Sequence, residues 1–329
     1  MDAIMLIWII PMAGIVGGAI GWLVRQFQYH REAKRQAARE TGDTLKDKKT
    51  LLEEMISKTE ETRSKQTLLR QLDEVNAALL GLYGKRLRHT LKEAGLPTEE
   101  TLIADGRTQL QPQQVDQLKG EIAELQTLPQ SDSILDLLAL GNAYYYAEQY
   151  EDAKDIYDRI LNLNPNDPSI LMSRGVAYGQ LGRYDEALAD FNRSLELRPD
   201  DPGTLTNRGN AYMELGRYNE ALADLNHSLE LSPDDPTTLH NLGCLYERLG
   251  RYDEAFADFN RSLELSPDDP VTLYDLACLC SLQRKTDDAL TYLERAIDAD
   301  NKYREDAKTD KDFDNIRSDP RFKKITEPD

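Results

Sequence analysis

Apolar and small residues recur at helical spacing through the second half of the chain, most clearly in residues 202–235. One set is spaced four and three residues apart and a second set repeats that spacing: Leu205, Gly209 and Tyr212, then Ala221, Leu225 and Ser228. Each set therefore falls on one face of a helix. Small side chains at Gly209 and Ala221 allow two helices to pack closely, and Asp235-Pro236 supplies a capping acid and a helix-starting proline. The pattern predicts a pair of packed helices.

This helix pair repeats along the chain with a period of 34 residues. The segment Gly-Arg-Tyr-Asp/Asn-Glu-Ala occurs at residues 182–187, 216–221 and 250–255, and prolines keep the same spacing: Pro165, Pro199, Pro233 and Pro267. A fixed period of this length indicates stacked helical hairpins, because one hairpin cannot bury its apolar face alone. The outermost copies depart from the pattern, with Glu148 in place of Gly and Asn301 in place of Pro. Such departures are expected of terminal repeats.

The repeated pattern resembles the tetratricopeptide repeat family, whose repeats carry the same order of large, small and aromatic positions. The resemblance covers five repeats at residues 134–301, about half of the chain. It implies an all-α fold in which the hairpins stack into an α-solenoid. Residues 302–329 are expected to form a C-terminal cap, with Phe313, Ile316 and Phe322 covering the last apolar face.

The N-terminal segment contains a long apolar run without charged residues, from Ala3 to Val24. A helix of this length reaches roughly 33 Å, enough to span a bilayer. Residues 1–25 are therefore predicted to be an uncleaved transmembrane helix. A secretory signal peptide is the alternative, but Asp2 stands where a basic residue belongs. Basic residues follow the run, so the positive-inside rule places the N-terminus outside and the bulk of the chain in the cytoplasm. The terminal cap and the repeats resemble those of bacterial arrays, which favours a bacterial inner membrane, and an outer organelle membrane with the same topology is the alternative.

Two stretches near the N-terminus predict helix–helix association. Within the apolar run, glycines form overlapping pairs four residues apart, which either create a membrane-helix packing face or reflect the frequency of glycine in membrane helices: Gly14, Gly17, Gly18 and Gly21. Residues 26–95 predict a charged helical stalk with a coiled-coil seam at Leu68, Leu72, Val75, Leu79 and Leu82. A continuous helix from Thr44 to Ala94 that associates with a second copy is the preferred interpretation, and folding back on the same chain is the alternative. Residues 96–133 predict a linker and a capping helix that begins at Pro112.

Composition limits the chemistry that the chain can perform. The net charge of −19 would repel phosphates, so no nucleic acid partner is expected. Cys244, Cys278 and Cys280 lie on predicted repeat helices, which suits free thiols. The sequence contains no glycine-rich phosphate loop, no nucleophile elbow and no pair of histidines at ligand spacing. We therefore expect no enzymatic activity, no cofactor and no metal.

The resemblance also implies a binding surface, because the first helix of each hairpin in this family lines a concave groove. Carried over position by position, the implied groove residues are Leu138, Asn142, Tyr145, Tyr146, Met172, Val176, Asn210, Met213, His240 and Tyr274. Asn142 and Asn210 are expected to bond the backbone of a bound peptide. Receptors of chaperone tails place lysines in this groove, whereas this chain has Leu138, Gly203 and Thr206 there. Alternatively, the helix at 112–128 covers part of the surface.

Together these patterns predict a membrane-tethered scaffold or adaptor that recruits a protein client into the groove without chemistry. Two alternatives stay open: a mainly structural protein that self-assembles as a homodimer through the membrane helix and stalk, or a regulatory subunit of a membrane enzyme complex. The sequence does not identify the client.

Overall fold

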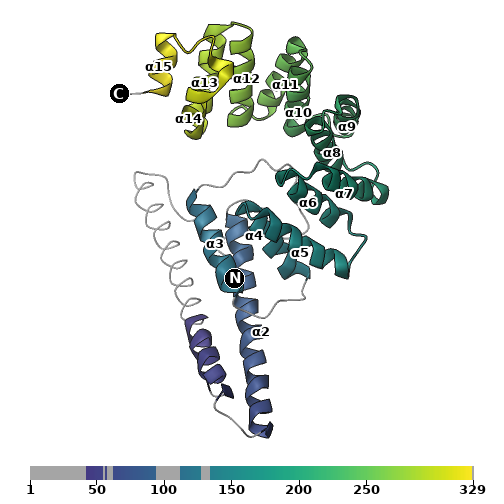
Figure 1. Cartoon of the computed structure of the whole chain (residues 1–329), viewed down its shortest axis with the longest axis vertical. Helices are drawn as coiled ribbons and strands as arrows, with labels where there is room; N and C mark the ends of the chain where they lie inside the picture. Colours follow the sequence, from purple (N-terminus) through teal and green to yellow (C-terminus); the bar gives the residue numbers. More distant parts are fainter. Residues whose placement is uncertain (1–41, 55, 58–61, 94–111, 127–133, 328–329) are drawn as a thin grey trace, which may run out of the picture. The chain divides into compact units, whose positions relative to one another are not determined.

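The computed structural model describes residues 42–54, 56–57, 62–93, 112–126 and 134–327, and the regular structure in these ranges is helical (Figure 1). The described residues fall into two compact units. The first contains the described residues up to Arg86 together with the end of the helix that includes Ala123. The second contains the described residues of Leu87–Ile122 and the chain from Ile134 onward. The predicted transmembrane helix at 1–25, with its four glycines, lies outside the described residues. Among the helices that are described, none is long and apolar enough to cross a bilayer.

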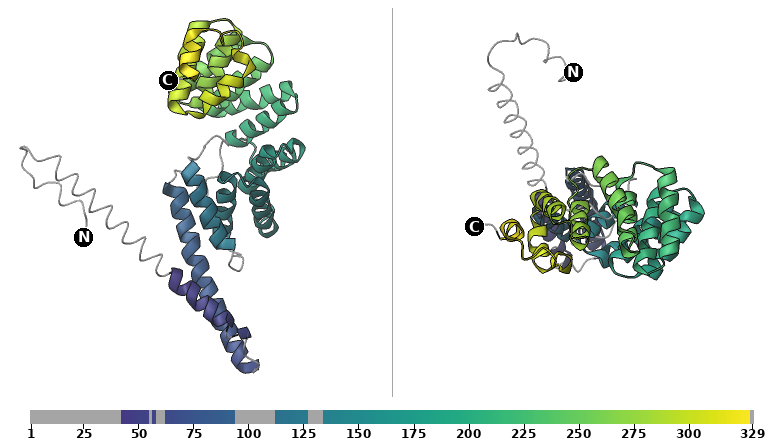
Figure 2. Two further views of the ribbon diagram at one scale, coloured as in Figure 1. Left: turned by 60° about the vertical axis from the view of Figure 1, so that its left-hand side comes forward. Right: turned by 90° about the horizontal axis from the view of Figure 1, so that it is seen from above.

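Five helical hairpins follow one another from α4 to α13 (Figures 1 and 2). In each hairpin the first helix has 13 residues and the second has 14. The pairs are α4 (Ile134–Tyr146) and α5 (Tyr150–Leu163), α6 (Pro168–Gln180) and α7 (Tyr184–Leu197), α8 (Pro202–Glu214) and α9 (Tyr218–Leu231), α10 (Pro236–Arg248) and α11 (Tyr252–Leu265), and α12 (Pro270–Leu282) and α13 (Thr286–Ala299). The predicted fold of the repeats is confirmed.

The packing within each hairpin follows from the small residues of the repeat. A Cβ added at Gly209 would lie 2.9 Å from Cγ of Leu225 and 3.4 Å from the carbonyl oxygen of Ala221, so only glycine permits this approach. The predicted capping is also present, since the carboxylate of Asp235 accepts a hydrogen bond from the backbone N–H of Thr238 at 2.7 Å. Capping of this kind satisfies N–H groups that have no partner within the helix.

The repeated Gly-Arg-Tyr segment forms the turn between the two helices of a hairpin. Gly216 has φ +71°, a left-handed conformation that glycine adopts without a steric penalty. The guanidinium of Arg217 lies over the ring of Tyr212, 4.4 Å from its centroid, and pairs with Glu220 at 3.0 Å. The most conspicuous sequence motif of the chain is thus a structural element of the turn.

The N-terminal described residues form a hairpin within one chain. Residues 42–54 are helical, and α2 (Thr62–Glu93) is a second helix. Leu52 packs in one buried cluster with Val75, Leu79 and Tyr83. The seam is therefore covered by the same chain, as in the fold-back alternative, and the preferred interpretation of one continuous, self-associating helix is corrected. The physical reason is that an apolar seam needs a partner face, and residues 42–54 supply one locally.

The C-terminal helix of this region, α3 (Pro112–Gln126), pairs with α2 through buried polar groups. The hydroxyl of Thr90 donates to a carboxylate oxygen of Glu121 at 2.8 Å, and the amide of Gln117 donates to the Thr90 hydroxyl at 3.2 Å. Leu118 and Ile122 on the same helix are buried.

After the last hairpin the chain continues as α14 (Lys302–Thr309), the short helix η1 (Lys311–Phe313) and α15 (Pro320–Thr326). Phe313, Ile316 and Phe322 are buried in one cluster with residues of α12 and α13. These aromatic and aliphatic side chains therefore cover apolar surface of the fifth hairpin.

Candidate functional site

The first helices of the hairpins form the inner face of the array. Contacts join α6 to α8, α8 to α10 and α10 to α12, in addition to the contacts within each hairpin. First helices can touch their counterparts only where the stack is narrowest, on the inside of the curve. The inner face is thus the surface to which the predicted groove residues belong.

A pocket of about 200 Å³ opens on this face between the second and third hairpins. It is lined by Val176, Gly179, Gln180, Tyr184, Phe191, Asn207, Asn210, Ala211 and Glu214. Val176, Ala211 and Phe191 are buried and give the pocket apolar walls, whereas Gln180, Asn210 and Glu214 are exposed. The pocket thus combines apolar walls with amide and carboxylate groups.

At the first hairpin, the predicted groove residues are engaged by the protein itself. Leu138, Asn142, Tyr145 and Tyr146 are all buried. The side-chain oxygen of Asn142 accepts a hydrogen bond from the Tyr157 hydroxyl at 3.0 Å, and the ring of Tyr145 meets that of Tyr146 edge-on. Burial raises the pKa of Tyr157 well above its ordinary value, which keeps that hydroxyl protonated and able to donate.

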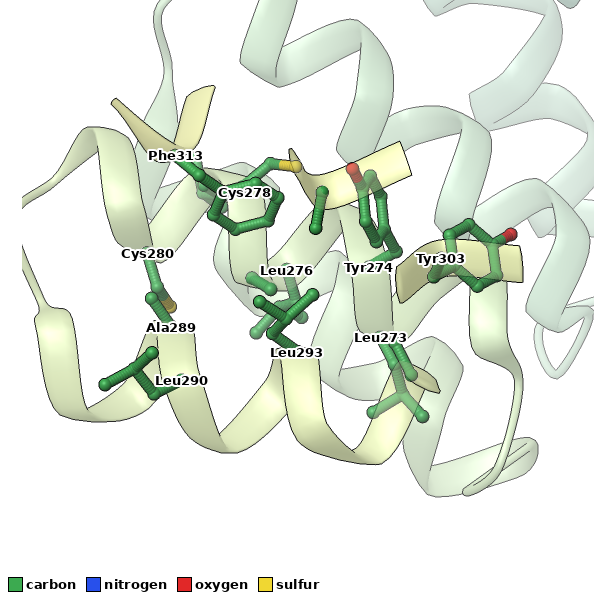
Figure 3. Close-up of a cluster of buried hydrophobic side chains, with 14 of the residues drawn as sticks. Leu273, Tyr274, Leu276, Cys278, Cys280, Ala289, Leu290, Leu293, Tyr303 and Phe313 are labelled. Atoms are coloured by element: carbon green, nitrogen blue, oxygen red, sulfur yellow. The ribbon is translucent and has the colours of Figure 1, made fainter. Parts of the chain in front are cut away.

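At the fifth hairpin, the C-terminal segment lies against the inner face (Figure 3). Tyr274 stacks on Tyr303 with ring centroids 4.6 Å apart, and its hydroxyl donates to a carboxylate oxygen of Asp310 at 2.9 Å. The hydroxyl of Ser281 donates to the backbone carbonyl of Asp312 at 2.6 Å. The position of Tyr274 in the predicted groove is therefore occupied by residues 303–313.

The remaining predicted residues lie in the middle of the array, and the pocket brings only some of them together. Val176 and Asn210 line it, and Asn210 is exposed. Met172, Met213 and His240 are buried and are not among the lining residues. Gln180 and Glu214 also occupy positions that the family resemblance assigns to the groove, and both line the pocket. Asn207 was not among those positions, and its polar side chain was the available signal.

Charges on the inner face are predominantly acidic toward its C-terminal end. Glu214 pairs with Arg248 at 2.6 Å. The residue before Arg248 is Glu247, and burial raises its pKa to about 7. Repulsion from the carboxylates of Asp312 and, to a smaller extent, Asp310 contributes to this increase. A partner that approaches this region meets negative potential.

His240 occupies a buried polar cluster between α10 and α12. Its Nδ1 lies 2.9 Å from the hydroxyl of Thr272, and its Nε2 lies 3.3 Å from a carboxylate oxygen of Asp275. The Sγ of Cys244 lies 3.2 Å from the same Nε2. The sequence analysis treated His240 as a groove contact. The spacing of four residues between His240 and Cys244 was the overlooked signal, because it places both side chains on one helix face.

Comparison with known proteins agrees with the fold. Stacked hairpins around a shared inner face define the class of α-solenoid proteins. Models of the tetratricopeptide repeat match residues 138–202, 200–268 and 234–302. These matches run through all five hairpins, and the chain belongs to the tetratricopeptide repeat family.

Two solved structures match about half of this chain. The array is similar to a thermophilic TPR protein of Thermus thermophilus, with 25% identity, a TM-score of 0.50, and coverage of 53% of this chain and 96% of that chain. A crystal structure of MamA matches with 18% identity and a TM-score of 0.41, over 49% of this chain and 95% of that one. The second likeness is too low to carry an inference about partners. No curated protein matches the sequence.

Proposed function

We propose that the protein is a scaffold that holds a segment of another protein in the central pocket of its inner face, and that residues 1–25 tether it to a membrane. Tetratricopeptide repeat proteins generally mediate protein–protein interactions. The observation that supports the position of the site is the contrast along the inner face: the first and fifth hairpins are occupied by the chain's own side chains, whereas Gln180, Asn210 and Glu214 are exposed around a pocket.

The size and lining of the pocket favour a polypeptide over a small metabolite. Its volume of about 200 Å³ lies below the roughly 300–1,000 Å³ of small-molecule sites and accommodates a client side chain. The amide of Asn210 can donate to and accept from an extended backbone, as in strand-like peptide recognition. The side-chain oxygen of Gln180 can also accept, while its nitrogen donates to the Tyr145 hydroxyl at 3.3 Å. Glu214 and the acidic surroundings disfavour an acidic segment. The client that fits is a neutral or basic segment with one apolar anchor.

The tether rests on the uncharged run from Ala3 to Val24. A membrane-bound scaffold raises the local concentration of its client, which increases association without any new contact. Homodimerisation remains part of this proposal only through the glycine pairs of that run, since Val75 and Leu79 of the predicted seam already pack within the chain. Extraction of full-length protein from membranes by alkaline carbonate would contradict the tether.

The client site is tested with peptides selected from a random library on the full-length protein. Asn210→Trp places a bulky ring in the pocket from an exposed position and should abolish peptide binding in fluorescence anisotropy. The matched control is Asn226→Trp, because Asn226 is exposed on the outer helix α9. Equal binding by both variants would contradict the proposed site.

A further inference from the structure

Three inner-face positions of the fourth and fifth hairpins, at which the residue varies from repeat to repeat, carry potential metal ligands. His240, Cys244 and Asp275 are residue types that bind metal ions. Counted in steps of 34, the third hairpin has Thr206, Asn210 and Asn207 at these positions. The three residues meet at one place, because α10 contributes the first two side chains and the adjacent α12 contributes the third.

The three ligand atoms have separations close to those of a tetrahedral site. Nε2 of His240 lies 3.2 Å from Sγ of Cys244 and 3.3 Å from Oδ2 of Asp275, and the sulfur lies 3.7 Å from that oxygen. Zinc bonds of about 2.0–2.3 Å give tetrahedral edges of about 3.3–3.8 Å, since the edge is about 1.6 times the bond length. The two distances to Asp275 fall in this range, and the Nε2–Sγ distance is slightly shorter, so a small side-chain shift would complete the geometry.

Hydrogen bonds behind His240 fix its tautomer for metal binding. The hydroxyl of Thr272 donates to the carboxylate of Asp269 at 2.5 Å, because a carboxylate can only accept. The Thr272 oxygen then accepts from Nδ1 of His240 at 2.9 Å, which places the imidazole hydrogen on Nδ1. Nε2 is left with its lone pair directed toward Cys244 and Asp275. Histidine ligands of metals are usually held by such an outer partner.

The surroundings carry negative charge, which favours a cation. Cys278 lies three residues after Asp275 on α12, and its thiol experiences the charges of Asp310, Asp275, Asp312 and Glu247. A divalent ion at this end of the inner face would reduce the repulsion among these carboxylates.

We propose that His240, Cys244 and Asp275 bind a zinc ion that links the fourth and fifth hairpins. One nitrogen, one thiolate and one carboxylate match the ligand preference of zinc, and three protein ligands leave a fourth position for water or for a side chain of a client. Binding requires that the Cys244 thiol lose its proton to solvent, so affinity increases with pH. This site is independent of the central pocket.

The test is a titration of full-length, chelator-treated protein with cobalt(II), which replaces zinc and reports its ligands by absorption. We expect one cobalt per chain, a thiolate-to-cobalt charge-transfer band, intense visible bands of tetrahedral geometry, and displacement by zinc. The residues of the third hairpin supply substitutions compatible with the fold: His240→Thr, Cys244→Asn and Asp275→Asn. Cys244→Asn should eliminate the charge-transfer band, and each of the others should weaken binding.

Two further variants distinguish the proposed site from its neighbours. Thr272→Val removes the outer partner of His240, together with the hydrogen bond from Thr272 to Asp269, but no metal ligand. It should weaken affinity by about 10- to 100-fold while the charge-transfer band persists at saturation. His227→Arg changes a partly exposed histidine to the residue of the neighbouring repeats and should leave binding unchanged.

A second group of potential ligands, Cys278 with Asp310 and Asp312, gives the proposal a clear competitor. If Cys278→Val eliminates the charge-transfer band and Cys244→Asn retains it, the ion binds at that group and the proposal is wrong. If the native protein shows no thiolate-to-cobalt charge-transfer band during the cobalt titration, the proposal is also wrong. Thermal unfolding supplies an independent measurement, because zinc should raise the Tm of the native chain but not of Cys244→Asn.

Discussion

The middle and the two ends of the repeat array share one backbone plan but differ in what their inner faces contact. In the second and third hairpins, exposed polar side chains surround a pocket. In the first hairpin Asn142 accepts a hydrogen bond from Tyr157, and in the fifth hairpin Tyr274 donates a hydrogen bond to Asp310. A groove position defined by repeat number is therefore not equivalent to an accessible position. At the ends of the array these side chains are engaged within the chain, whereas in the middle Gln180, Asn210 and Glu214 are exposed on the inner face.

The hairpins also differ in whether the same position of the repeat pattern carries an ion pair between the two helices. Arg208 forms two hydrogen bonds with Asp224, at 2.7 and 2.8 Å, and Arg174 makes the equivalent pair in the second hairpin. In the fourth hairpin Leu242 replaces the arginine, and burial raises the pKa of Asp258 to about 6. One repeat position therefore stabilises the middle hairpins but not the fourth.

The largest expected effect concerns the C-terminal closure. Phe313 is fully buried against Tyr274, so Phe313→Ala should lower the free energy of unfolding by about 3–5 kcal/mol in urea titrations. Lys311→Ala alters an exposed residue of the same short helix and is the control. A small effect at Phe313 would mean that residues 303–313 do not close the inner face.

An intermediate loss of stability is expected when the ion pair between Arg208 and Asp224 is removed. Asp224→Asn leaves Arg208 without its carboxylate partner and should cost about 1.5–3 kcal/mol at pH 7, as measured by chemical unfolding. Asp190→Asn in the second hairpin should cost less, since Arg174 keeps a second carboxylate partner in Asp158 at 2.6 Å and burial already raises the pKa of Asp190.

The equivalent change in the fourth hairpin should have the opposite sign. Because the pKa of Asp258 is raised in the folded state to about 6, the folded chain binds the proton more tightly, and stability is lost as pH rises through this value. Asp258→Asn should therefore stabilise the protein at pH 7, by about 1 kcal/mol after allowance for partial exposure, and the gain should vanish near about pH 4. Thermal unfolding from acidic to neutral pH measures this difference. A destabilised Asp258→Asn at pH 7 would refute it.

The last two predicted changes in stability concern the hairpin turns and have opposite signs. Gly182, Gly216 and Gly250 have φ +71°, whereas Glu148 and Arg284 adopt φ 61° at the equivalent turns of the outer hairpins. Gly216→Ala should cost about 1–2 kcal/mol and Glu148→Gly should gain about 1 kcal/mol or less, because a side chain is strained in this conformation. Differential scanning calorimetry of the two variants would reveal shifts of Tm in opposite directions. Shifts of the same sign would contradict this explanation.

Local features of the fold could be predicted from the sequence, because neighbouring residues determine them. Gly209 opposite Ala221, and Asp235 before Pro236, act within one hairpin, so their roles follow from spacing and residue type. The seam at Val75 and Leu79 predicts an apolar contact but not its partner, since an apolar stripe packs equally well on the same chain or on another. Only the tertiary structure shows that residues 42–54 cover it.

The site was less predictable for the same reason. Tyr145 and Tyr274 occupy positions that face the groove in an isolated repeat, but both are buried. Tyr145 packs edge-on against Tyr146 and Tyr150, and Tyr274 stacks on Tyr303 of the C-terminal segment. His240 meets Asp275 only because the neighbouring hairpin packs beside it, which the sequence does not show. The spacing of four residues between His240 and Cys244, in contrast, was visible in the sequence.

We expect a client to bind the inner face in the middle of the array. Photo-crosslinking of a library-selected peptide tests this directly, with the crosslinking residue placed at exposed positions in the central pocket, on the fifth hairpin and on the outer surface, namely Asn210, Leu282 and Asn226. A crosslink is expected from Asn210 and none from the other two. A crosslink from Leu282 in the absence of one from Asn210 would contradict it and place the client at the C-terminal end of the array.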